Sequence, residues 1–172
     1  MRTTLLAAVF LPLLCLPAPG ALQAQHVPGG PTIDWDAAQN EFTRTVLREY
    51  SVLINQWRLS LSDPLRHRSA SYYTDGAQLL MSGYPPVQGR DSIGAFLARL
   101  APDLIELRTG ISDFMASDRL AFATGPLIFT QREGSDTISV IGSHVTVLVR
   151  EGRRWRIRSQ VLNYDSGTPT AD

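Results

Sequence analysis

Arginines crowd the C-terminal part of the sequence, and they are the clearest group of side chains that could do chemistry. The group consists of Arg150, Arg153, Arg154, Arg156 and Arg158, around a predicted turn at residues 151–152. In a strand, Arg156 and Arg158 would share one face, and Trp155 and Ile157 would share the other. We expect a solvated strand face or a subunit contact, and a site for anions is the alternative.

The other titratable residues match no catalytic motif. All 16 basic residues are arginine, which excludes a Schiff-base lysine and a lysine-based dyad. The sequence has no Gly-x-Ser-x-Gly elbow, no His-Glu-x-x-His motif and no glycine-rich phosphate loop. His67 and His144 lie on different predicted elements and do not make a metal-ligand set. The sequence therefore predicts no metal and no cofactor, and it leaves the catalytic residues, if any, unknown.

His144 lies on a predicted strand of alternating residues. Ser143, Val145, Val147 and Val149 recur at every second position around it. We expect these residues to share the inward face of the strand, so that His144 points outward to solvent or a partner subunit. A structural role is the expectation for His144, and a catalytic role is the alternative.

The N-terminal segment, residues 1–24, is typical of an export signal. Arg2 is positively charged, residues 5–16 are apolar, and residues 17–24 are small or helix-breaking. The apolar stretch is about a dozen residues, whereas spanning a membrane takes about 20. We expect cleavage after Ala24, or after Ala21 as the alternative. The protein would then be periplasmic or extracellular, soluble and without a stable membrane anchor.

Cleavage would remove Cys15, the only cysteine, so the exported chain would have no disulfide and no thiol nucleophile. The formal net charge is zero, which together with export disfavours a nucleic-acid partner. The remaining chain has the size of one domain. We expect a flexible lead over residues 25–33, a folded domain over residues 34–165 and a disordered tail over residues 166–172.

Helical patterns come first in the predicted domain. Asp34 is expected to cap a long helix with apolar residues at spacings of three and four. These residues are Phe42, Val46, Tyr50, Leu53, Ile54, Trp57 and Leu61. Asp63 and Pro64 predict the start of a second helix that ends near Tyr73. A third helix is predicted between Gly89 and Pro102.

Strand patterns dominate the rest of the domain. A short strand at residues 77–81 is predicted between the second and third helices. Alternating residues then predict strands at 104–109, 111–116, 120–131, 137–150 and 155–164. Helices followed by a meander of strands indicate an α+β domain.

Three stretches in this order resemble a known superfamily. An aromatic first helix precedes Asp63–Pro64, residues 72–100 combine a strand, a Pro/Gly turn and an amphipathic helix, and residues 145–157 form a hairpin ending in Trp155-x-Ile157. Together they resemble the nuclear transport factor 2-like superfamily, in particular its SnoaL-like and ketosteroid-isomerase-like bacterial members. The resemblance covers residues 42–164. It implies a cone-shaped, cystatin-like α+β barrel, in which three N-terminal helices pack on a curved, mostly antiparallel sheet.

The resemblance to ketosteroid isomerases implies a tyrosine, a base and a buried acid in the pocket. On this chain the tyrosine would be Tyr50, but the base would fall at or near Met81 and the acid at Ser143. Methionine cannot take a proton, and loss of a positioned base lowers a rate by about 10² to 10⁴. Classical ketosteroid isomerase chemistry is therefore not expected.

The pocket implied by the resemblance would be mostly apolar, with a few hydroxyl and amide groups. Its candidate lining residues are Tyr50, Trp57, Met81, Phe96, Ser143, Ser159 and Asn163. The first three could equally be core residues.

We expect this pocket to bind a small apolar or amphipathic molecule without catalysis. A SnoaL-like isomerase, cyclase or hydratase with unassigned groups is the first alternative, and a non-catalytic dimerisation domain is the second. The resemblance also implies a homodimer, formed through a sheet face that is expected to carry His144, Thr146 and Leu148.

Overall fold

The computed structural model describes residues 32–33, 40–62 and 66–164. Its helical elements are α1 (Glu41–Ser62), the 3₁₀ helix η2 (Arg66–Tyr72) and α2 (Arg90–Leu100). Its strands are β1 (Thr32–Ile33), β2 (Tyr73–Met81), β3 (Val87–Gln88), β4 (Leu104–Ile111), β5 (Asp113–Ala116), β6 (Leu120–Glu133), β7 (Asp136–Glu151) and β8 (Arg154–Tyr164). The predicted export signal, Asp34, Asp63–Pro64 and the tail at residues 166–172 lie outside the described residues.

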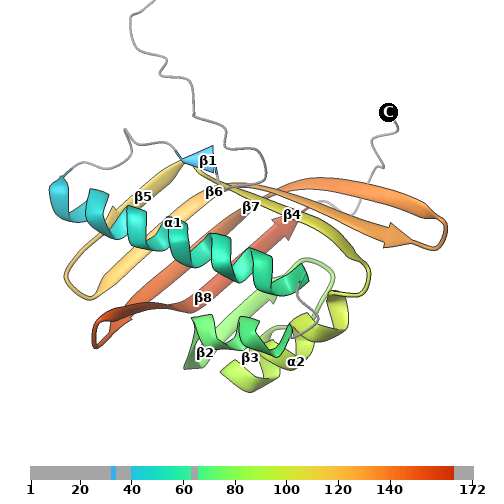
Figure 1. Ribbon diagram of the computed structural model, residues 1–172, viewed down its shortest axis with the longest axis horizontal. Coiled ribbons are helices and arrows are strands. Elements are labelled where there is room, and N and C mark those ends of the chain that lie inside the picture. The colour runs from blue at the N-terminus through green and yellow to red at the C-terminus, as the bar shows by residue number, and fades with distance from the viewer. Residues whose placement is uncertain (1–31, 34–39, 63–65, 165–172) are drawn as a thin grey trace, which may run out of the picture.

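One curved sheet carries the domain, and α1 lies along one of its faces (Figure 1). The strand order is β1-β4-β6-β7-β8-β2-β3, and β5 pairs with β6. Most neighbours are antiparallel, but β2 runs parallel to β8 and β1 runs parallel to β4. The prediction of an α+β fold is confirmed. In the described part of the chain the sheet stays open rather than closing into a barrel.

The elements near the N-terminus differ in detail from the prediction. Helix α1 begins at Glu41, where the Asn40 side chain accepts a 2.8 Å hydrogen bond from the Thr43 amide. The second predicted helix is one short 3₁₀ segment, because Tyr73 already pairs with Ile157 as the start of β2. Strand β1 lies in the predicted flexible lead, and it pairs with the end of β4.

The core lies between α1 and the inner face of the sheet. The apolar stripe of α1 is buried as predicted, except that Phe42 is 41% exposed. The sheet contributes Thr146 and Gln160, which are register partners and fully buried. Polar groups thus sit in the middle of an otherwise apolar interior.

The two faces of β7 are the reverse of the prediction. His144, Thr146 and Leu148 point into the core and are 2% exposed or less, whereas Val145 is 39% exposed on the outer face. The prediction assumed that Val145, Val147 and Val149 lie on the buried face of the strand. A phase error of one residue moves every side chain of a strand to the opposite face. The error arose because both faces of this sheet carry apolar residues.

Candidate functional site

The interior of the cone, where the resemblance places the pocket, is packed with side chains. Tyr50 and Trp57 have no exposed surface, and the Tyr50 ring stacks on Phe114 at a centroid distance of 5.7 Å. Neither residue lines any of the three cavities described below. Both therefore act as core residues in this structure, the alternative that the sequence left open.

A row of polar groups crosses this interior beneath α1. Nε2 of His144 bonds to the Gly110 carbonyl oxygen at 2.7 Å, and Thr146 Oγ1 lies 3.4 Å from His144 Nδ1. The Tyr73 hydroxyl donates to Gln160 Oε1 at 2.5 Å. Burial raises the pKa of Tyr73 and lowers the pKa of His144. At neutral pH the tyrosine thus keeps its proton and the imidazole is uncharged, as suits enclosed groups.

The polar candidates from the sheet lie on its outer face. Ser143 pairs with Asn163, and Ser159 pairs with Val147, each in the phase opposite to the buried residues of β7 and β8. Ser143 and Asn163 are exposed, and Ser159 is half-buried. The seven predicted pocket residues therefore do not line one cavity.

Two adjoining cavities bring some of the candidates together, and we call them the Tyr84 cavities because Tyr84 lines both. Met81 and Asn163 line the smaller one, of about 280 Å³. Phe96 lines the larger one, of about 510 Å³. The Tyr84 ring meets the Phe96 ring edge-on at 5.2 Å, and the Arg99 guanidinium lies 6.0 Å from the Phe96 centroid.

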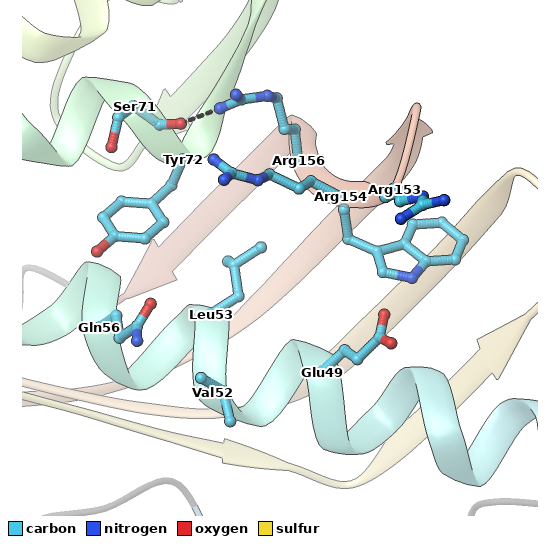
Figure 2. Close-up of a pocket in the computed structure, with 10 residues that line it drawn as sticks. Glu49, Val52, Leu53, Gln56, Ser71, Tyr72, Arg153, Arg154 and Arg156 are labelled. Atoms are coloured by element: carbon cyan, nitrogen blue, oxygen red, sulfur yellow. Dashed lines mark hydrogen bonds between the residues drawn. The ribbon is translucent and has the colours of Figure 1, made fainter.

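A third cavity of about 480 Å³ lies between α1, the end of η2 and the start of β8, and we call it the arginine groove. Its lining residues are Glu49, Val52, Leu53, Gln56, Ser71, Tyr72, Arg153, Arg154, Trp155 and Arg156. Figure 2 shows the α1 residues on one wall and the arginines on the other. Helix, turn and strand thus each supply part of the groove.

The turn between β7 and β8 places the arginines at the groove. Glu151 pairs with Arg154 in register, so Gly152 and Arg153 form the two-residue connection. Gly152 has a φ of 62°, a left-handed conformation that glycine adopts without steric cost. This tight turn sends Arg153 and Arg154 out of the same end of the sheet.

The arginines of the groove are not equivalent. Arg156 forms an ion pair with Glu151 at 3.1 Å and also donates to the Ser71 carbonyl oxygen. Arg153 and Arg154 are exposed and have no ion pair with an acidic residue of the described chain. Glu49 is the one carboxylate among the lining residues. Two uncompensated guanidinium groups thus share the groove with a single carboxylate.

Apolar side chains form much of the remaining surface of the groove, together with the polar Gln56 and Ser71. Leu53 and Trp155 are buried at its base, Tyr72 is half-buried, and Val52 is 58% exposed on α1. The Trp155 ring is also covered by Arg150, whose guanidinium carbon lies 6.0 Å from the ring centroid. A groove with an apolar base and cationic side chains suits a molecule that has both an apolar and an anionic part.

Comparison with known proteins gives a fold. No family model and no curated protein matches this sequence. A nuclear transport factor 2-like protein with a cystatin-like fold from Novosphingobium aromaticivorans aligns with a TM-score of 0.56 at 13% identity, over 76% of this chain and 94% of its own. The chain has the nuclear transport factor 2-like fold. This confirms what the sequence resemblance implied about architecture.

Two further proteins with the nuclear transport factor 2-like fold are of different kinds. A ketosteroid isomerase-like protein from Erwinia carotovora atroseptica aligns with a TM-score of 0.63 at 14% identity, over 74% of this chain and 99% of its own. A hexachlorocyclohexane dehydrochlorinase aligns with a TM-score of 0.61 at 18% identity, over 77% and 94%. Identities this low establish the shared fold, and function has to be argued from the site.

Within this nuclear transport factor 2-like fold, only one wall of the arginine groove could be expected from the sequence. The arginine cluster was recognised, with an anion site as one alternative. The opposite wall was missed because Glu49, Val52 and Gln56 lie outside the apolar stripe of α1 and look like an ordinary solvent face. Val52, an apolar residue on that face, was the one available indication.

Among residues 32–33, 40–62 and 66–164, no three His, Cys, Asp or Glu side chains are grouped so that they could hold a metal ion. None of the helices in that part of the chain is long and apolar enough to cross a membrane.

Proposed function

We propose that this protein is a non-catalytic binding module that holds a small amphipathic molecule in the arginine groove. The observation that carries the proposal is the combination of a partly exposed apolar base with guanidinium groups that have no acidic partner in the described chain. The groove volume of about 480 Å³ lies within the range of about 300 to 1,000 Å³ that is usual for small-molecule sites.

The chemistry of the groove supports binding rather than proton transfer. Arginine keeps its proton at any ordinary pH, so Arg153 and Arg154 can orient an anion but cannot act as general bases. Three of the groups that could exchange protons, Tyr50, Tyr73 and His144, are enclosed in the core, and the groove itself adds only the Glu49 carboxylate and the Tyr72 phenol. The alternative of a SnoaL-like isomerase or lyase would need access to this interior.

The arginine groove is a better candidate than the Tyr84 cavities. The smaller Tyr84 cavity, about 280 Å³, falls just below the usual range for ligand sites. In the larger one, the single arginine, Arg99, already lies near the Phe96 ring. The arginine groove therefore offers more unused binding groups.

The test is a fluorescence titration of the exported protein with the uncharged dye N-phenylnaphthylamine. We expect Val52→Gln to weaken binding, because it replaces exposed apolar surface of the groove by a polar amide. Glutamine is a good helix former, so α1 should stay intact. Leu59→Gln is the matched control, since Leu59 is 54% exposed on the same helix but does not line the groove.

Two outcomes would overturn the proposed function, and a third would count against the groove as its site. One is the absence of binding by this dye and by its charged analogue described below. The other is binding that Tyr84→Ala removes and Val52→Gln leaves intact, which would move the site to the Tyr84 cavities. Equal effects of Val52→Gln and Leu59→Gln would also count against the groove.

We also propose that the protein is a homodimer formed through the outer face of the sheet. This face carries exposed apolar side chains on β2 and β7, the two strands that flank β8, among them Leu80 at 37%, Ile141 at 66% and Val145 at 39% exposure. A contiguous apolar surface is a typical sign of a protein contact. The sequence analysis expected His144, Thr146 and Leu148 on the dimer face, but these three residues are buried on the inner face of the sheet.

Export is the remaining part of the proposal, and it rests on the sequence pattern of residues 1–24. N-terminal sequencing of the protein recovered from outside the inner membrane should begin near Gln25. A protein that keeps Met1, or that leaves the membrane only with detergent, would contradict the proposal.

A further inference from the structure

We infer that the molecule bound in the arginine groove is an organic anion with one charged end, held by Arg154 beside Arg156, and an apolar body that lies over Val52 and Leu53. This inference rests on the proposed function, because it names the class of ligand for the same groove.

The position of Arg154 is the first part of the argument. Figure 2 shows its side chain reaching along the groove toward Tyr72, with the Arg156 guanidinium beside it at the same end. Arg156 is fixed there by Glu151 and by the Ser71 carbonyl. Arg154 has no ion pair with an acid of the described residues. An incoming carboxylate, sulfonate or phosphate would supply this missing partner.

The distribution of charge gives the ligand its polarity. Glu49 lines the groove from α1, and Figure 2 shows it on the opposite wall from Arg154 and away from Tyr72. A second anionic group near Glu49 would meet a like charge, which costs binding energy. A molecule with a single anionic end therefore fits the groove better than a dianion.

Apolar side chains of α1 also line the groove. Val52 is 58% exposed, and Leu53 lies beside it at the base of the groove. Burying such surface contributes about 25 cal/mol per Å². The apolar body of the ligand would thus supply affinity, and Arg154 would supply the preference for an anion.

The experiment compares two dyes with the same ring system, anilinonaphthalene sulfonate and the uncharged N-phenylnaphthylamine, by fluorescence titration of the exported protein. We expect Arg154→Gln to weaken binding of the sulfonate about fivefold, the upper range for a partly exposed ion pair, and to leave the uncharged dye unchanged. Arg158→Gln is the matched control, because Arg158 is an exposed arginine of the same strand outside the groove.

Salt and Glu49 provide two independent checks. Raising the ionic strength should weaken binding of the sulfonate and leave binding of the uncharged dye unchanged, because salt screens exposed charges. Glu49→Gln should strengthen binding of the sulfonate, since it removes a like charge from the groove. Thermal unfolding of each variant confirms that the fold is intact, as expected for exposed side chains.

The outcomes separate this inference from the proposed function. If both dyes bind equally well, and Val52→Gln weakens both while Arg154→Gln weakens neither, the groove binds ligands but the anion inference is wrong. If the sulfonate binds but neither Arg154→Gln nor Val52→Gln affects it, both the inference and the groove are wrong. If neither dye binds, the proposed function itself fails.

Discussion

The hydroxyl of Tyr73 donates a 2.5 Å hydrogen bond to Oε1 of Gln160, and both side chains are completely buried. The hydroxyl of Tyr50 lies in the same interior, beside Thr146, but it completes no hydrogen bond of good geometry. Loss of the Tyr73 hydroxyl would thus leave a buried acceptor without its donor, whereas loss of the Tyr50 hydroxyl would not.

Tyr73→Phe should therefore destabilise the fold more than Tyr50→Phe. Removing the Tyr73 hydroxyl leaves the buried Gln160 carbonyl oxygen without its donor, which costs about 1 to 3 kcal/mol. Removing the Tyr50 hydroxyl breaks no complete hydrogen bond, so its cost should be below about 1 kcal/mol. Urea unfolding of the two variants measures the difference. Equal losses of stability would show that the Tyr73–Gln160 bond does not stabilise the fold.

Stability should fall as the pH falls below about 6.5, the ordinary pKa of histidine. Burial holds the pKa of His144 below that value, so the folded protein keeps His144 neutral where the unfolded chain takes up a proton. The unfolded state then binds more protons, and its population rises with acidity. The contribution of neutral His144 to stability is complete above pH 6.5 and is lost as the pH drops toward the pKa of His144 in the folded state.

Urea unfolding at pH 7.5 and 5.5 measures this effect, in a window above the ordinary pKa values of carboxylic acids. His144→Gln should lower stability at the higher pH and reduce the difference between the two conditions. A wild-type protein that is equally stable at both values would argue that His144 is not held neutral.

The order of the elements could be predicted from the sequence because local signals mark it. The residues at the turns, such as Gly152, and the apolar stripe around Tyr50 and Trp57 each encode their own element. The fold class and the long strands β6, β7 and β8 were found in this way. The phase of β7 could not be found, because Val145 and Leu148 are both apolar and only tertiary packing decides which of them is buried.

The arginine groove shows the same limit at the level of the site. The sequence placed Arg154 and Arg156 in one cluster, since they are neighbours along the chain. It could not place Glu49 and Val52 opposite them, because that contact depends on how α1 lies across the sheet. The seven predicted pocket residues do not line one described cavity for a related reason, because Ser143 was expected in the interior and lies on the outer face of its strand.

Gly125→Ala should destabilise the fold by about 1 to 3 kcal/mol, the usual cost of overpacking. A Cβ atom at position 125 would lie 2.2 Å from the Gly110 carbonyl oxygen, the atom that bonds to His144. The backbone would have to move away, and this would strain the hydrogen bond to His144. Thermal unfolding measures the loss.

Gly76→Ala is the matched control for this substitution. Its Cβ would lie 3.3 Å from the guanidinium end of Arg158, a flexible side chain that can give way. Alanine also lowers the conformational entropy of the unfolded chain, so Gly76→Ala should be neutral or slightly stabilising. If Gly125→Ala and Gly76→Ala lower the stability equally, the close approach of the two strands at Gly110 does not exclude a side chain at position 125.

Ile141→Arg should convert the proposed homodimer to a monomer without unfolding it. Ile141 is 66% exposed on the outer face of the sheet, so a charge there would be desolvated in a dimer but hydrated in a monomer. Leu59→Arg is the matched control, because Leu59 is 54% exposed on α1, away from this face. Light scattering at tens of micromolar protein should give a dimer mass for the wild type and for Leu59→Arg, and a monomer mass for Ile141→Arg. A monomeric wild type, or a dimer that only Leu59→Arg disrupts, would remove the outer face as the dimer contact.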